Sequence, residues 1–190
     1  MKRMNSVFTS AAFICLSLLI VVLGFRIHQL KELVDEIRPR PRVGEWVPTY
    51  PASTLDGSPV TLGDPQGRLQ VFYLFSPACP VCKEMESQIA AIHQRIVDSG
   101  ELVEMYGVSA VPADMLRGYV AEGRSRYPVV QLESRKMVSL MQVHSVPTMI
   151  VVDREGIVQW AHVGPVDDAV EQTLDAILSI EQPHLLHGDN

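Results

Sequence analysis

Two cysteines three residues apart are the side chains in this sequence most able to do chemistry. They lie in "SPACPVCK", where Cys79 and Cys82 enclose Pro80 and Val81. Such a pair can bind zinc, form a permanent disulfide or exchange disulfides with another protein. Structural zinc takes four ligands, and beyond Cys15 the chain has only these two cysteines. A disulfide across so short a loop removes little entropy from the unfolded chain, so redox exchange is the favoured interpretation.

The elements predicted around the pair give its two sulfurs different environments. "LQVFYLF" (69–75) is apolar throughout, which predicts a strand buried on both faces, and a helix is predicted from Pro80 to Asp98. Cys79 then lies at the helix start, where free N–H groups stabilise a thiolate, and we expect it to be the attacking thiol. Cys82 falls on an apolar stripe, which predicts a shielded thiol that resolves the mixed disulfide. The stripe continues through Met85, Ile89, Ile92 and Ile96.

Strands and helices alternate along the rest of the chain, which predicts an α/β domain with a central mixed sheet. A hairpin is expected over 54–62, where Asp-Gly separates two short extended runs. The other expected elements are a strand at 101–109, a helix at 112–123, a strand at 128–132, a brief helix at 135–141, paired strands at 147–153 and 157–163, and a helix at 166–180.

The N-terminal region predicts a membrane anchor. Residues 4–25 carry no charge, and 22 helical residues rise about 33 Å, enough to cross a hydrocarbon core of about 30 Å. We therefore predict a cytoplasmic segment at 1–5, a retained transmembrane helix at 6–25, and a juxtamembrane helix with a Pro/Arg linker ("RPRPRVG") at 26–42. Lys2 and Arg3 favour a cytoplasmic N-terminus, although positive charge also follows the span.

Residues 43–183 are predicted to form one soluble domain, followed by a loose tail at 184–190. From Val43 onward there are 9 Lys and Arg against 19 Asp and Glu, a balance of −10, while the whole chain carries −6. Phosphate contacts need clustered basic side chains, so a nucleic-acid partner is disfavoured.

Three segments resemble one family. "FSPACPVCK" resembles the active-site segment of thioredoxin-fold proteins. The segments "STLDGSPVTLGDPQGR" (53–68) and "VHSVPTMIVVDREGIVQWAHVG" (143–164) resemble membrane-anchored TlpA/ResA-type thiol–disulfide oxidoreductases, and the anchor together with "SPACPVCK" is also similar to their MauD-like (methylamine utilisation) branch.

The resemblance implies a thioredoxin-like fold with an N-terminal hairpin extension, behind the transmembrane helix. It places the chain in the inner (plasma) membrane, with the domain facing the periplasm or cell exterior. Cys79 would attack and Cys82 resolve, with Pro80 and Val81 tuning the redox potential. Val146 and a cis Pro147 would form the substrate-binding edge.

The same resemblance implies particular partners. These are proteins with cysteines or disulfides and a membrane electron carrier, with no cofactor and no metal. Net direction, as reductant or oxidant, is left open, because the dipeptide between the cysteines can move the potential widely.

Some positions depart from the family pattern, and other functions remain as alternatives. Tyr73, six residues before Cys79, occupies a position where many thioredoxins carry a buried acid. Glu84 and Glu86 read as surface charge. The main alternative function is copper(I) handling by the two cysteines with His144, since copper(I) favours soft thiolates. A peroxidase is disfavoured because Phe72 replaces the proline that would lead its loop, and a non-catalytic binding module is the third option.

Overall fold

The structure is a computed structural model that describes residues 16–29, 41–63, 68–99, 102–133, 136 and 141–180. The chain divides into two units, Met1–Arg38 and Pro39–Asn190, and the division falls inside the predicted linker. Residues 1–15, 30–40 and 181–190, which hold the predicted cytoplasmic segment, much of the anchor and linker, and the tail, lie outside the described residues.

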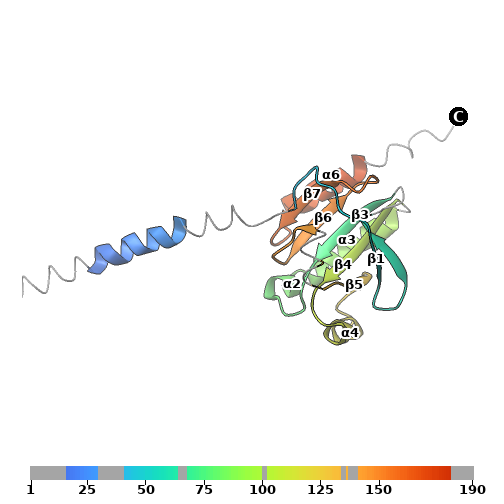
Figure 1. Cartoon of the computed structure of the whole chain (residues 1–190), viewed down its shortest axis with the longest axis horizontal. Helices are drawn as coiled ribbons and strands as arrows, with labels where there is room; N and C mark the ends of the chain where they lie inside the picture. The colour runs from blue at the N-terminus through green and yellow to red at the C-terminus, as the bar shows by residue number, and fades with distance from the viewer. Residues whose placement is uncertain are drawn as a thin grey trace, which may run out of the picture. The chain divides into compact units, whose positions relative to one another are not determined.

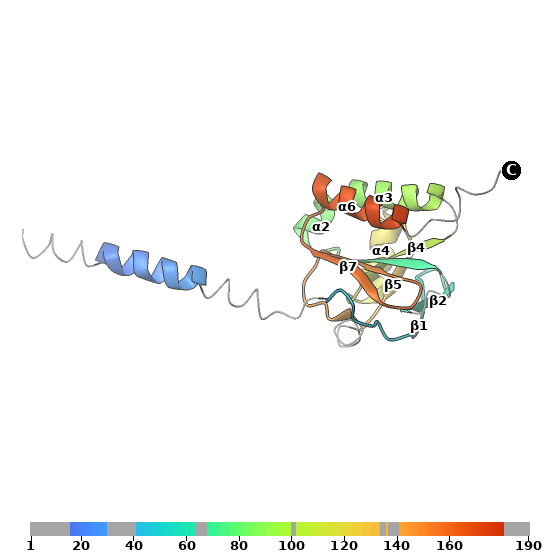
Figure 2. The same ribbon diagram turned by 90° about the horizontal axis from the view of Figure 1, so that it is seen from above.

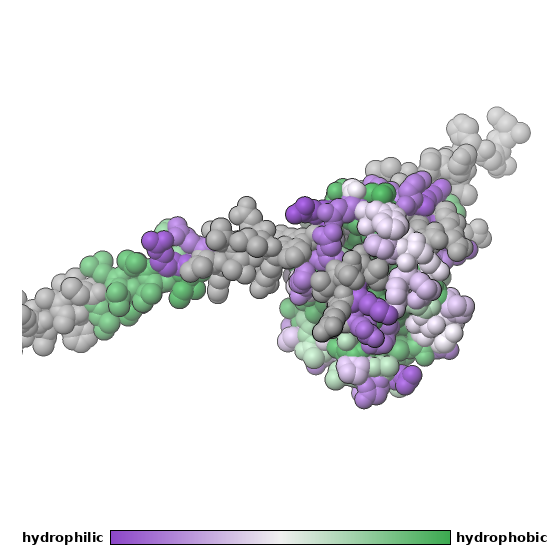
Figure 3. All heavy atoms as spheres, viewed as in Figure 1, coloured by the Kyte–Doolittle hydropathy of each residue, from purple (hydrophilic) through white to green (hydrophobic). Residues whose placement is uncertain are grey.

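The first unit contains a helix at residues 16–29. It continues past residue 25, where the predicted transmembrane helix ends. Its large apolar side chains between Leu16 and Ile27 are 52–68% exposed, and they form the green band of this helix in Figure 3. Within the described residues, no helix is both long enough and apolar enough to cross a membrane.

The second unit is built on a five-stranded mixed sheet with the strand order β5-β4-β3-β6-β7 (Figure 1). β3 lies at its centre, parallel to β4 and antiparallel to β6. All six residues of β3 are buried, as its apolar sequence predicts. The thioredoxin-like α/β architecture with a central mixed sheet is therefore confirmed. The strands are β3 (Leu69–Leu74), β4 (Val103–Ser109), β5 (Val129–Gln131), β6 (Thr148–Val152) and β7 (Val158–Val163).

Alternate residues of β3 point into two separate cores. Tyr73, and Phe75 directly after the strand, face a core shared with the helices α3 (Glu86–Ser99), α4 (Ala113–Ala121) and α6 (Asp168–Ile180). Figure 2 shows α3 and α6 side by side over this face of the sheet. Phe72 and Leu74 face the second core, which residues from the N-terminal part of the domain and from 141–143 complete.

The predicted hairpin precedes the sheet and begins earlier than expected. Its strands are β1 (Tyr50–Ser53) and β2 (Pro59–Leu62), paired antiparallel. The turn occupies the start of the expected strand, because Asp56 accepts hydrogen bonds from the Thr54 hydroxyl and from the Ser58 N–H. Gly57 in this turn has φ +91°, a conformation that glycine adopts without strain.

Both edges of the sheet are paired with the N-terminal part of the domain. At the β7 edge, the Gly44 N–H donates to the Val158 carbonyl and the Val158 N–H donates to the Glu45 carbonyl, each at 2.8 Å. At the β5 edge, the Leu55 N–H donates to the Val129 carbonyl at 2.9 Å. One segment, residues 44–55, therefore reaches both ends of the five-stranded sheet.

The helix predicted from Pro80 to Asp98 is interrupted. It forms as α2 (Pro80–Glu84) and α3, separated by Met85, whose φ of −91° and ψ of −4° depart from regular helix. The brief helix predicted at 135–141 is described only at Lys136 and Met141, since 135 and 137–140 lie outside the described residues. The helix that begins after Cys79 is therefore short, so its dipole stabilises a Cys79 thiolate less than the single long helix predicted from the sequence would.

Candidate active site

The loop after β3 places Cys79 at the start of α2. The Cys79 N–H donates to the Ser76 carbonyl at 3.0 Å, and the Ala78 N–H donates to the Ser76 hydroxyl at 3.2 Å. Pro80 then takes the first helical turn, where its missing N–H leaves no helix hydrogen bond unmade. Cys79 is thus the N-cap residue of α2, as the sequence predicts.

Cys79 is half-buried, and its sulfur lies between two backbone groups. The Cys82 N–H donates to Cys79 Sγ at 3.3 Å. The Cys79 thiol lies 3.8 Å from the Val146 carbonyl oxygen, 67 residues further along the chain. Both cysteines are free thiols. The attacking sulfur predicted from the sequence is therefore accessible and held by backbone contacts.

Cys82 is in a different environment, with only 3% of its surface exposed. Burial raises the pKa of its thiol to about 12, and the hydrogen bond with Cys79 acts in the same direction. The rest of the predicted stripe is buried with it, from Met85 to Ile96. The predicted asymmetry between one accessible and one shielded thiol is present in the structure.

The Val146–Pro147 segment adjoins the thiols from the start of β6. The peptide bond between the two residues is cis, in agreement with the prediction. Pro147 is buried and Val146 half-buried. The loop is fixed at both sides, since the Thr148 hydroxyl donates to the Ser145 carbonyl at 2.8 Å and the Gly164 N–H donates to the Pro147 carbonyl at 2.9 Å.

The two residues between the cysteines differ in exposure. Pro80 is exposed, while Val81 is half-buried and packs on the core under the helices. Their proposed effect on the redox potential stays a prediction.

The ligand set considered for copper(I) does not come together. His144 is exposed, and the described residues contain no group of three His, Cys, Asp or Glu side chains arranged to hold a metal ion. Met85, Met141 and Met149 are buried in the two cores, as expected of core methionines.

An aromatic cluster beneath Cys82 was only partly visible in the sequence. The Tyr73 ring stacks on Phe75 with centroids 5.6 Å apart, and it meets Tyr127 edge-on at 5.9 Å. Tyr119 packs against Phe75 at 5.4 Å. The sequence indicates Tyr73 only through its position six residues before Cys79. Tyr127 lies between predicted elements and carried no signal.

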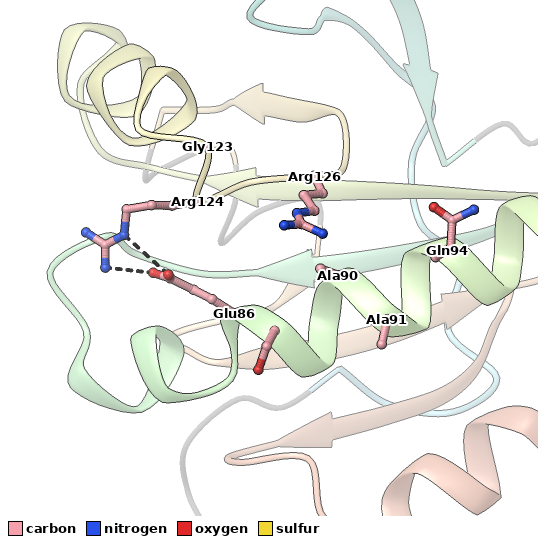
Figure 4. A pocket seen from close by; sticks show the side chains of 8 residues that line it. Glu86, Ala90, Ala91, Gln94, Gly123, Arg124 and Arg126 are labelled. Atoms are coloured by element: carbon pink, nitrogen blue, oxygen red, sulfur yellow. Dashed lines mark hydrogen bonds and ion pairs between the residues drawn. The ribbon is translucent and has the colours of Figure 1, made fainter.

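The structure corrects the interpretation of Glu86 as surface charge. Glu86 is half-buried and accepts two hydrogen bonds from Arg124, at 3.2 Å from Nε and 2.8 Å from Nη2. The pair closes one end of a surface pocket of about 540 Å³ between α3 and the segment after α4 (Figure 4). Arg126 lines the same pocket, and neither cysteine does. Glu84, by contrast, is exposed as predicted.

Comparisons with known proteins agree with the fold. Over 122 residues the chain is 25% identical to "Methylamine utilization protein MauD" of Methylobacillus flagellatus, covering 63% of this chain and 56% of that protein. It is 22% identical over 160 residues to "Thioredoxin-like protein YneN" of Bacillus subtilis, covering 83% and 94%. The chain thus spans little more than half of the MauD protein.

A solved structure gives the same fold. It is described as a putative thiol:disulfide interchange protein DsbE from Chlorobium tepidum, with a TM-score of 0.63, 18% identity, and coverage of 74% of this chain and 98% of that one.

The family assignment rests on the greater part of the domain. Residues 43–161 match the AhpC/TSA family. That match begins at the end of the predicted linker, includes the hairpin, both cysteines and the Val146–Pro147 segment, and ends within β7. The chain belongs to the AhpC/TSA family and has a thioredoxin-like fold.

Proposed function

We propose that this protein is a membrane-anchored, extracytoplasmic oxidoreductase that exchanges disulfides with protein substrates through Cys79 and Cys82. The observation that carries the proposal is the difference between the two free thiols. Cys79 is accessible at the start of α2, whereas Cys82 is 3% exposed. Exchange requires this arrangement, because one thiol must meet the substrate while the other must attack only the mixed disulfide.

The chemistry proceeds in two exchanges. The Cys79 thiolate attacks a substrate disulfide, which forms a mixed disulfide and releases one substrate thiolate. Cys82 then attacks Cys79, which forms the internal disulfide and releases the second substrate thiol. The reverse sequence oxidises a substrate dithiol. A substrate chain lying along Val146, whose carbonyl is 3.8 Å from Cys79, would meet the sulfur in an extended conformation.

The anchor and compartment are supported by the N-terminal unit. Apolar side chains exposed in water are unfavourable, and a bilayer would bury those between Leu16 and Phe25. A compartment outside the cytoplasm permits disulfides to persist. We place the chain in the inner (plasma) membrane, with the domain facing the periplasm or cell exterior. A membrane electron carrier would reset the cysteines after each turnover.

A trapping experiment tests the exchange reaction. Cys82→Ser in the full chain keeps the attacking thiol and removes the resolving one, so mixed disulfides with cell proteins should accumulate and disappear under reducing electrophoresis. Cys79→Ser is the matched control and should trap nothing, because the remaining thiol is buried. Adducts formed by Cys79→Ser but not by Cys82→Ser would reverse the assigned roles.

A fusion experiment tests the topology. A reporter that is active only outside the cytoplasm, fused after Asn190, should be active, and a reporter that is active only in the cytoplasm should be silent. The opposite pattern would place the thiols in a reducing compartment and contradict the proposed location.

A further inference from the structure

Tyr73 has a buried hydroxyl that lacks a full hydrogen bond among the described residues. The residue lies in the central strand β3, is 1% exposed, and belongs to the core that also contains Cys82. Its ring is held between Phe75 and Tyr127. Among the described residues, its hydroxyl makes no hydrogen bond. Because buried polar groups are nearly always paired, this exception requires an explanation.

The ionisable neighbours of this hydroxyl identify the group that it faces. Burial contributes most to the raised pKa of Tyr73. The neighbouring Cys82 raises this pKa further, and Tyr119 and Cys79 add smaller effects in the same direction. Conversely, Tyr73 acts to lower the pKa of Cys82. The two side chains belong to the same core, and a hydrogen-bonding interaction between them acts on the pKa of each, so the hydroxyl lies beside the thiol although the pair does not meet the geometry of a full hydrogen bond. A neutral thiol is a weak acceptor, which accounts for the unpaired donor in the reduced protein.

The state of Tyr73 limits what it can do in the reaction. Its raised pKa keeps the hydroxyl protonated at any pH at which the protein works, so it can donate a hydrogen bond but cannot take a proton from Cys82. The strong acceptor that it could meet is the Cys82 thiolate, which forms only when the mixed disulfide is resolved. Hydrogen bonds to charged groups are roughly twice as strong as those between neutral groups.

We propose that Tyr73 is a positioning residue that stabilises the Cys82 thiolate during resolution, by donating a hydrogen bond from its hydroxyl to the sulfur. The inference rests on the proposed exchange reaction. In the resolving step, the Cys82–Cys79 bond forms and the bond between Cys79 and the substrate sulfur breaks. The proton that leaves Cys82 ends on the departing substrate thiolate, and Tyr73 keeps its own proton.

Tyr127 provides a matched control. It is 5% exposed, its hydroxyl is also without a hydrogen-bond partner among the described residues, and its ring touches that of Tyr73. The ionisable groups that act on it are Tyr119, Tyr73 and Glu86, and neither cysteine is among them. Tyr73→Phe and Tyr127→Phe therefore each remove a buried hydroxyl, and only the hydroxyl of Tyr73 faces the thiol.

The experiment follows the release of a coloured nitrobenzoate thiolate from a mixed disulfide preformed on Cys79 of the full chain, as a function of pH. Tyr73→Phe should slow release about 10-fold and move the pH profile about one unit upward. Tyr127→Phe should match the wild type in both. Both variants should form the mixed disulfide at the wild-type rate, since that step uses Cys79.

Three results would overturn the proposal. Resolution by Tyr73→Phe at the wild-type rate and pH would show that the hydroxyl plays no part. Equal slowing in both tyrosine variants would assign the effect to packing. A wild-type protein that forms the mixed disulfide but never releases the second thiolate would overturn the exchange reaction itself and, with it, the role of Tyr73.

Discussion

Gly107 allows a quantitative test of the packing beneath the thiols. It lies in β4, directly opposite Tyr73 in β3. A Cβ added there would lie 2.4 Å from Cε2 of Tyr127, 2.8 Å from its Cδ2, and 3.1 Å from Cε1 of Phe75. Carbon atoms pack at about 3.5–4.0 Å, so the Tyr127 ring would have to move by about 1 Å. The ring is 5% exposed and lies edge-on to both Tyr73 and Phe75, which leaves it little room.

Gly107→Ala should therefore lower the free energy of unfolding by about 1–3 kcal/mol, the usual cost of overpacking a core. The measurement is denaturant unfolding of the reduced full chain, followed by tryptophan fluorescence. Gly118→Ala is the control, because its Cβ in α4 would have no atom within 4 Å. That variant should gain up to about 1 kcal/mol, since alanine favours helix over glycine. If Gly107→Ala were as stable as the wild type, the described packing of Tyr127 would be refuted.

Three further predictions follow from the site. Alkylation of the reduced protein at pH 7 should modify Cys79 long before Cys82, because a pKa of about 12 leaves on the order of 1 in 10⁵ Cys82 thiols ionised. Mass spectrometry of the alkylated peptides would show the order of modification, and equal alkylation rates for the two thiols would contradict the prediction. Because the pKa of Cys82 is raised in the folded state, its contribution to stability is complete below pH 9 and is lost toward pH 12. Unfolding free energies should accordingly fall more steeply over that range for the wild type than for Cys82→Ala, and parallel curves would count against the burial effect. Arg124→Ala should lower the free energy of unfolding by a small amount that shrinks at high salt, because it removes the bidentate pair with half-buried Glu86. Arg126→Ala in the same pocket, which has no ion pair with described residues, should leave the free energy of unfolding almost unchanged; similar losses in the two variants would contradict the pair's role.

Sequence patterns predicted the parts of the site that depend on local spacing. The unbroken apolar run at 69–75 predicted the buried central strand, and spacings of three and four from Cys82 predicted which thiol is shielded. These features follow from neighbours in the chain or from short periodic patterns. The cis Val146–Pro147 bond was expected from the family resemblance and not from local spacing, and the structure has it.

The features that sequence did not predict depend on distant contacts. The interruption at Met85 has no local signal, because methionine favours helix and no proline follows. The Glu86–Arg124 pair joins residues 38 positions apart and forms only because the end of α4 is held over α3. The unpaired hydroxyl of Tyr73 likewise requires knowledge of every atom that surrounds it.

The pairing of residues 44–55 with both sheet edges has a consequence for how the protein is made. An open edge strand exposes N–H and C=O groups that can join the sheet of another molecule and lead to aggregation. During synthesis, residues 44–55 leave the ribosome before β5 and β7, the strands whose edges they cover. The sheet can therefore be covered as soon as it forms. A chain shortened to begin after this segment would keep both cysteines, yet it would have two open edges through which its copies could associate.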